Sequence, residues 1–178
     1  MTRDSTAAAT LTLEAVETPL GDFLLVTDAE GLLRAAEFAD CEHRLHRHFG
    51  RRLGPNRTRL VAGRVPDAIK AALAAYFAGD IAAIDGIAVR GDGTPFQESV
   101  WAALRTVRHP TTYVGLGARI GRPDAARAVG HANGANPMSI VVPCHRLVGA
   151  DGALTGYGGG IARKRWLLDH EAAHAAAD

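Results

Sequence analysis

The periodicity of the apolar residues changes once along this chain, and the change divides it into two parts. Residues 11–38 hold short β-prone runs such as FLLVT and LLRAAEF, separated by the turn segments TPLGD and DAEG. Such a pattern is typical of a small antiparallel meander. From Thr94 onward the apolar residues recur at helical spacing. We therefore predict an α/β N-terminal domain over residues 1–90 and a mainly helical C-terminal domain over residues 91–178.

The segments between the meander and Thr94 complete the N-terminal part. We expect a helix over 40–49, a loop or linker over 50–64, a helix over 66–80 that begins near Pro66 and ends at Gly79, and a crossover loop over 81–94.

Three helices are expected after residue 94. The first is TPFQESVWAALRTV, with Thr94 as its capping residue. The segments YVGLGARIG and DAARAVGHANGANP then read as helix, tight turn, helix, with Gly121 ending one helix and Asp124 opening the next. This pair fits a helix-turn-helix that enters a DNA groove, and it equally fits a helical hairpin that only packs.

Composition limits the class of protein. A chain of 178 residues with 47% hydrophobic residues can form a sizeable core. It has no run of eighteen apolar residues, and its first twenty residues lack a signal-peptide core, so we expect a cytoplasmic protein without a membrane partner. Residues 95–171 carry nine Lys and Arg against five acids, which leaves a net −3 for the rest of a chain whose total is +1. A basic C-terminal part favours a polyanionic partner.

Two cysteines, Cys41 and Cys144, offer neither a disulfide framework nor a four-ligand zinc site. His43, His46 and His48 follow Cys41 closely, so a metal site is one interpretation of this cluster. A polar helical face with solvated imidazoles is the interpretation we favour.

Cys144 stands at the end of the segment SIVVPCHR. Ser139 to Val142 is expected to be a buried strand that Pro143 ends, which places the thiol at a strand end. A histidine that acts as base or partner lowers the pKa of a thiol, and His145 is adjacent, although an extended backbone would turn it away. Glu171 is a candidate third member that orients the imidazole. A buried structural cysteine remains the alternative.

Residues 149–160 follow with six glycines in twelve positions. Such a loop brings backbone amides close to a flat ligand, or it is merely flexible.

These motifs together resemble a known family. PCHR, the upstream segments FQESVWAAL and AARAVGHANGANP, and the downstream segment LTGYGGGIARKRWLLDHE are similar to the O6-alkylguanine-DNA alkyltransferases, also called methylated-DNA–protein-cysteine methyltransferases. The resemblance is strong over residues 94–171. It is weaker, though in the right order, for TPLGDFLLVTDAEGLLRAAEF and AAYFAGD.

The resemblance implies direct reversal of DNA damage. Cys144 would take the alkyl group from O6-alkylguanine, with O4-alkylthymine as a second candidate substrate, in one irreversible displacement on a flipped nucleotide. His145 would act through a water as base and Glu171 would polarise it. Asn136 would brace the chain beside the nucleophile by backbone hydrogen bonds. Tyr113 would crowd the 3′ phosphate and donate a proton or hydrogen bond to the leaving guanine.

The resemblance also implies a fold and further contacts. The N-terminal domain would have ribonuclease-H-like topology without nuclease residues, and the C-terminal helix-turn-helix would enter the minor groove of alkylated double-stranded DNA. Arg127 would fill the gap left by the flipped nucleotide. The DNA-binding residues would be Tyr113, Ala126, Arg127, Ala128 and Gly130, and the pocket residues Leu147, Tyr157, Gly158, Gly159 and Lys164. No cofactor and no metal are expected, and the protein would be a monomer.

Two departures and two alternatives accompany this interpretation. The connection VRHPTTY is about two residues shorter than usual in the family, and YVGLGA holds extra glycines, each of which costs roughly 1 kcal/mol inside a helix. Both features bear on the placement of Tyr113. A non-catalytic DNA lesion sensor would bind DNA without a mass change, and a cysteine hydrolase using Cys144, His145 and Glu171 would turn over an ester or amide.

Overall fold

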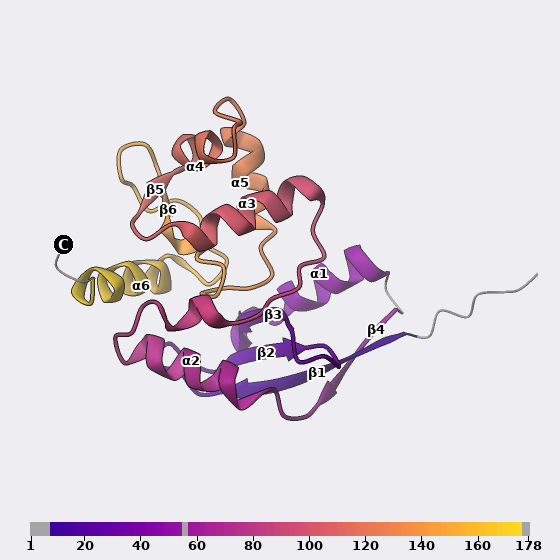
Figure 1. Ribbon diagram of the computed structural model, residues 1–178. Coiled ribbons are helices and arrows are strands. Elements are labelled where there is room, and N and C mark those ends of the chain that lie inside the picture. Colours follow the sequence, from indigo (N-terminus) through magenta and orange to yellow (C-terminus); the bar gives the residue numbers. More distant parts are fainter. Residues whose placement is uncertain (1–7, 55–56, 176–178) are drawn as a thin grey trace, which may run out of the picture.

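A four-stranded sheet flanked by two helices carries a second, helical body in the computed structural model, which describes residues 8–54 and 57–175 (Figure 1). Residues 1–7, which belong to the first twenty residues where we expect no signal peptide, lie outside these ranges. No helix in the described part of the chain is long and apolar enough to cross a membrane.

The sheet has the strand order β3-β2-β1-β4. Strands β1 (Ala9–Val16), β2 (Phe23–Thr27) and β3 (Leu33–Phe38) pair antiparallel, which confirms the predicted meander. Strand β4 (Thr58–Ala62) pairs parallel to β1. Residues 50–64 are therefore not simply a loop or linker, and that prediction was wrong. Strand β4 is an edge strand of half-buried and exposed residues, and its sequence TRLVA lacks the clear alternation of apolar and polar residues that reveals a strand.

Both faces of β2 are buried, because a helix covers each side of the sheet. The short η1 (Ala39–Cys41) leads into α1 (His43–Leu53), which extends beyond the predicted end at residue 49. Leu45 and Phe49 of α1 pack on one face with Leu24, and α2 (Asp67–Phe77) packs on the other with Phe23. The prediction of solvated imidazoles on α1 holds for His43 and His46, which are exposed, and not for His48, which is half-buried.

The helical body follows the short η2 (Ala83–Gly86) and the segment 87–94. It contains α3 (Pro95–Thr106), β5 (Thr111–Thr112), α4 (Tyr113–Arg119), α5 (Ala126–Gly134), η3 (Cys144–Arg146), β6 (Leu147–Val148) and α6 (Ile161–Ala173). Thr94 caps α3 in a capping box with Gln97, and Gly121 ends α4 with φ 70°, both as predicted. Asp124 does not open α5. Ala125 is the cap residue, because a turn over Arg122–Ala125 delays the helix by one residue.

The extra glycines of α4 have packing reasons. A Cβ atom on Gly117 would lie 2.7 Å from the carbonyl oxygen of Arg122, and one on Gly115 would lie 2.8 Å from the Thr111 hydroxyl. Both approaches are too close for a side chain. Glycine lowers the helical propensity at these two positions. Its missing side chain is what permits the tight turn into α5 and the contact with β5.

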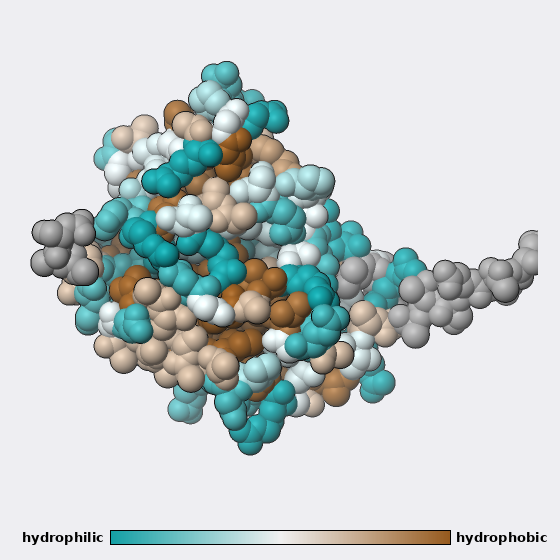
Figure 2. Space-filling model, in the orientation of Figure 1, coloured by the Kyte–Doolittle hydropathy of each residue, from teal (hydrophilic) through white to brown (hydrophobic). Residues whose placement is uncertain are grey.

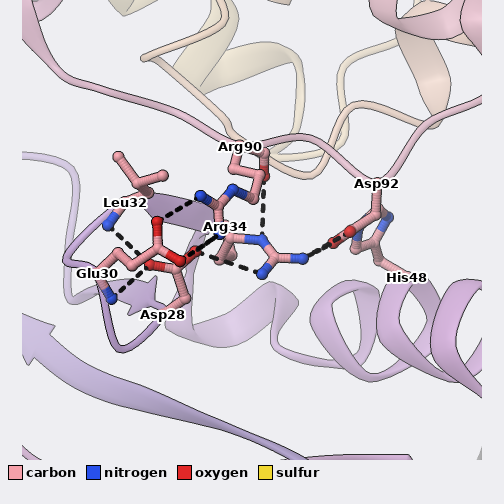
Figure 3. Close-up of polar contacts among 7 residues, drawn as sticks. All are labelled: Asp28, Glu30, Leu32, Arg34, His48, Arg90 and Asp92. Atoms are coloured by element: carbon pink, nitrogen blue, oxygen red, sulfur yellow. Dashed lines mark hydrogen bonds and ion pairs between the residues drawn. The ribbon is translucent and has the colours of Figure 1, made fainter.

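The two bodies meet along the free edge of β3. Leu33 bridges to Val89 and Ala36 bridges to Met138, so one strand edge holds both the crossover and the segment before the cysteine. Arg34 binds Asp92 at 2.5 Å, and Arg90 binds Asp28 and Glu30, which ties the crossover to the sheet (Figure 3). One hydrophobic cluster runs through both bodies, from Phe38 to Trp101 and Leu167. The domain boundary at residues 90 and 91 thus stays a prediction.

The surface differs between the centre and the tip of the molecule. In the view of Figure 2, apolar residues gather in the middle of the face, and the loop between α4 and α5 forms a hydrophilic tip. This loop contains Arg122 and Asp124.

Candidate active site

The segment before the cysteine is anchored on the sheet. Ala36 of β3 donates its amide to the Pro137 carbonyl at 2.9 Å and accepts from the Ser139 amide at 2.8 Å. The hydroxyl of Ser139 donates to the Glu37 carboxylate at 3.1 Å. Strand β3 therefore fixes the position at which the chain enters the site.

Residues 139–142 form a compact buried turn, so the predicted strand was wrong although the predicted burial is right. Ile140 has φ 69°, an uncommon value for a β-branched residue, and the chain reverses there. The Val142 amide donates to the Met138 carbonyl at 2.9 Å across this turn. An apolar run in a sequence does not distinguish a buried strand from a buried turn, because both hide their side chains.

Asn136 braces the turn from inside. Its side-chain amide donates to the Val142 carbonyl at 2.9 Å, and its side-chain oxygen accepts from the Met138 amide at 2.9 Å. Only 2% of Asn136 is exposed, so these hydrogen bonds are shielded from water. They are the side-chain to backbone hydrogen bonds that the family resemblance implies for this residue. A part in catalysis stays a prediction.

Cys144 begins a single 3-10 turn, η3, rather than following a strand. In an extended backbone, the side chains of Cys144 and His145 would point to opposite sides. In this turn they need not do so. Cys144 is 5% exposed. Burial raises the pKa of its thiol to about 11, although the Asn136 amide and the charges of Arg44 and Lys164 act in the opposite direction. The thiol is therefore neutral at pH 7.

Glu171 of α6 binds the last two residues of η3, His145 and Arg146. Its Oε1 atom lies 2.7 Å from His145 Nε2, and its Oε2 atom accepts from Arg146 Nε at 2.8 Å. Burial alone would raise the pKa of this carboxyl, but His145 and Arg146 lower it to about 2. Glu171 is thus ionised at neutral pH. The structure brings Cys144, His145 and Glu171 together as predicted, with no direct hydrogen bond between Cys144 and His145 among the described residues.

Two residues of this network were missed in the sequence. Arg146 donates to both carboxylate oxygens of Glu171 and also to the Val107 carbonyl. Tyr76 of α2 donates its hydroxyl to Glu171 Oε1 at 2.8 Å. Arg146 lies within the PCHR motif, so its position beside Cys144 and His145 is a signal that the sequence contains. No pattern in the sequence links Tyr76 to a carboxylate 95 residues away.

The glycine-rich loop packs tightly against the N-terminal body. A Cβ atom on Gly159 would lie 2.8 Å from the Phe38 ring, and one on Gly158 would lie 2.3 Å from the Arg44 guanidinium. Gly159 is therefore required by close packing against a ring, which argues against simple flexibility there, whereas at Gly158 the neighbouring group is the end of a flexible arginine side chain that can shift. The Tyr157 ring lies 6.3 Å from the His145 ring, edge to face.

Lys164 fastens the same loop from α6. Its ammonium group is buried and donates to the carbonyls of Leu147 and Thr155, at 2.5 Å and 2.6 Å. The predicted pocket residues Leu147, Tyr157, Gly158, Gly159 and Lys164 thus lie around η3 and the start of α6.

Tyr113 comes to the same region. Strand β5, directly before it, pairs with β6, directly after η3. The Tyr113 hydroxyl lies 3.1 Å from the Thr155 hydroxyl, and a Cβ atom on Gly130 would lie 3.7 Å from the Tyr113 ring. The short connection VRHPTTY therefore leaves Tyr113 between α5 and the glycine-rich loop.

The remaining predicted DNA-binding residues lie on α5. Arg127 and Ala128 are exposed, and Ala126 and Gly130 are half-buried. The alternative of a metal site at Cys41 and the neighbouring histidines has no support in residues 8–54 and 57–175, where no three His, Cys, Asp or Glu side chains group suitably.

Fold and site together define a two-body protein with a buried, neutral thiol beside a carboxylate-held histidine. Comparisons with known proteins agree with this class. Residues 95–173 match the family described as 6-O-methylguanine DNA methyltransferase, DNA binding domain. The methylated-DNA–protein-cysteine methyltransferase of Salmonella typhimurium is 46% identical over 160 residues, which is 89% of this chain and 94% of that protein. The chain belongs to the methylated-DNA–protein-cysteine methyltransferase family.

Solved structures show the same likeness. The O6-methylguanine methyltransferase of Mycobacterium tuberculosis has a TM-score of 0.74 at 36% identity, covering 94% of this chain and 96% of that one. The M. tuberculosis OGT in complex with DNA also has a TM-score of 0.74 at 36% identity, with 92% and 94% covered. The O6-methylguanine-DNA methyltransferase of the archaeon Pyrococcus kodakaraensis has a TM-score of 0.67 at 26% identity, with 90% and 98% covered.

Proposed function

We propose that this protein repairs O6-alkylguanine in DNA by moving the alkyl group to Cys144. The Sγ–C bond forms as the C–O6 bond breaks, the repaired guanine stays in the DNA, and in the net reaction the guanine gains the one proton that the thiol loses. The protein is thus consumed, because a thioether is not reversed. The observation that carries this proposal is the η3 turn, which sets a buried thiol beside a histidine 2.7 Å from a buried carboxylate.

Activation of the thiol follows from its environment. A neutral thiol is a poor nucleophile, so its proton must leave as the substrate arrives. We assign this proton to His145 through one water, since the Nδ1 atom of His145 is buried and has no hydrogen-bond partner in the described part of the chain. Glu171 then stabilises the imidazolium from Nε2, and Arg146 keeps Glu171 ionised.

Access to the base requires nucleotide flipping. O6 lies inside a duplex, beyond the reach of a buried thiol, so the damaged nucleotide must leave the stack at a cost of a few kcal/mol. We assign Arg127, which is exposed on α5, to fill the gap, and Tyr113 to donate to the leaving guanine. Helices α4 and α5 would act as a helix-turn-helix in the minor groove. Their short turn supports this assignment.

The wider setting completes the proposal. The strand order β3-β2-β1-β4, with β4 parallel to β1, supports ribonuclease-H-like topology for the N-terminal part. Alkylated double-stranded DNA is the proposed partner, and Leu147, Tyr157, Gly158, Gly159 and Lys164 would enclose the flipped base. We further propose a cytoplasmic monomer, on the grounds of composition and cysteine usage.

Peptide mass spectrometry tests the proposal directly. The protein is mixed with excess duplex DNA that carries one O6-methylguanine, with Cys144→Ala as the negative control and Cys41→Ala as the matched control. We expect one added methyl group on the Cys144 peptide, saturating at one per protein, in the wild type and in Cys41→Ala. An unmodified peptide with DNA still bound would favour the lesion sensor. Turnover of a model ester would favour the hydrolase.

A further inference from the structure

Helix α1 carries a charge pattern that the proposed reaction leaves unused. Its eleven residues, HRLHRHFGRRL, include four arginines and three histidines and no acid. Arg47 and Arg51 stand four residues apart, so they share one face of the helix and repel each other. Such a face loses stability unless an anion binds to it.

A groove of about 450 Å³ lies between α1 and α5. Four arginines of α1 line one wall, and residues from the second half of α5 line the other. Among the described residues that line it, Glu37 is the only acid, and Arg44 neutralises it through an ion pair of 2.7 Å. The groove therefore keeps a strong positive charge. We call it the α1–α5 groove.

The remaining arginines lack counter-charges. Arg47 and Arg51 are exposed and make no ion pair or side-chain hydrogen bond with any residue that the structure describes. Within residues 8–54 and 57–175, the one side-chain hydrogen bond of Arg52 goes to the neutral amide oxygen of Gln97. Guanidinium groups pair bidentately with phosphate. Arginines without an acidic partner are therefore suited to bind a phosphate group.

The exposed face of α5 leads into this groove. Arg127, His131 and Gly134 follow one another at spacings of four and three residues, so they lie along one side of the helix, and all three are exposed. His131 and Gly134 line the groove. A Cβ atom on Gly134 would meet nothing within 4 Å, which leaves open space for an approaching backbone.

We propose that the α1–α5 groove binds the sugar–phosphate backbone of the DNA beside the damaged base, so that the N-terminal body contributes a second DNA contact. This inference rests on the proposed function, because it needs DNA on α5. An eleven-residue helix is about 16 Å long, which matches about five nucleotides of one strand. The occupant is a phosphate chain because the free groups are arginines on a wall without unpaired acids.

The test compares the double variant Arg47→Gln/Arg51→Gln with Arg57→Gln/Arg59→Gln. The control removes the same charge from exposed arginines of the same body that do not line the groove. Equilibrium binding to lesion-containing duplex is measured across a salt series, on a duplex shown by titration to hold one protein copy and on a longer one. Each lost phosphate contact should flatten the plot of log K against log salt by about 0.9.

We expect the groove variant to bind the single-copy duplex on the order of tenfold more weakly at 0.15 M salt, with a slope flatter by about 2. The control should match the wild type. Unchanged slopes, or a loss on the longer duplex alone, would overturn the proposal, the latter in favour of a contact between protein copies. Methyl transfer to Cys144 at saturating DNA reports separately on the proposed function, and the groove variant should retain it.

Discussion

The nucleophile of this protein is stored in its unreactive form. Burial holds the Cys144 thiol at a pKa of about 11, against the pull of Asn136, Arg44 and Lys164. Only the thiolate attacks carbon or is readily oxidised, so a neutral thiol protects a residue that is used once. The same burial makes the reaction depend on proton removal at the moment when the substrate binds.

The raised pKa of the Cys144 thiol predicts how this residue reacts with a small alkylating reagent in the absence of DNA. In a Cys41→Ser variant, the rate with iodoacetamide should rise about tenfold per pH unit from pH 7 to 9.5 without levelling, since the thiolate fraction keeps growing below a pKa of about 11. Mass spectrometry of timed samples measures it. A plateau near pH 8.5, the range of an ordinary thiol, would contradict the storage argument.

Tyr76 extends the site into the N-terminal body. Its hydroxyl donates to the oxygen of Glu171 that also faces His145, and neither side chain is more than 8% exposed. Tyr76→Phe should lower the free energy of unfolding by about 1.5–3 kcal/mol, because a buried hydrogen bond to a charged group is lost. It should also slow methyl transfer to Cys144 at neutral pH, since Glu171 then holds His145 less firmly. Urea unfolding and single-turnover kinetics measure the two effects.

A matched tyrosine serves as the control for stability. The Tyr157 hydroxyl is buried and has no hydrogen-bond partner among the residues described. Tyr157→Phe should therefore leave the free energy of unfolding unchanged or raise it slightly. Equal losses in both variants would show that the Tyr76 hydrogen bond has no special weight.

At the scale of elements, periodicity predicts what is amphipathic and misses what is not. Helices α2 and α3 each have a buried and an exposed side, so their apolar residues recur at helical spacing, whereas the meander is recognised by its β-prone runs and the turn segments between them. The sequence of β4, TRLVA, has no clear alternation of apolar and polar residues, and the turn 139–142 is wholly buried, so periodicity reveals neither. The contacts of Asn136 and Glu171 follow from motifs near the cysteine, whereas that of Tyr76 depends on how the two bodies pack.

The glycine-rich loop gives an element-scale prediction. Gly159→Ala should lower the free energy of unfolding by about 1–3 kcal/mol and slow methyl transfer, because the new methyl group would overlap the rings of Phe38 and Tyr157. Gly156→Ala, in the same loop, is the control, since a Cβ atom there meets nothing within 4 Å. Thermal unfolding and single-turnover kinetics should separate the two variants. Similar behaviour would mean that the loop is loose rather than packed.

At the scale of the whole molecule, the N-terminal body acts as a frame for the thiol. The edge of β3 holds the segment before Cys144, Phe38 supports the glycine-rich loop, and Tyr76 reaches Glu171. These contacts come from two elements of that body, strand β3 and helix α2. The site is therefore assembled across the contact between the bodies, and a change at Cys144 acts on both of them.

Methylation of Cys144 should accordingly destabilise the whole protein. An added methyl group in a well-packed interior costs about 1–3 kcal/mol, and here it lies beside the turn that Asn136 braces between α5 and the cysteine. For a chain of this size each kcal/mol lowers Tm by about 2–4 °C, so the methylated protein should melt several degrees below the free protein. Calorimetry after removal of the DNA measures the shift, with Cys144→Ser carried through the same treatment as control. An unchanged or higher Tm after complete methylation would contradict this prediction and would mean that the site already has room for the alkyl group.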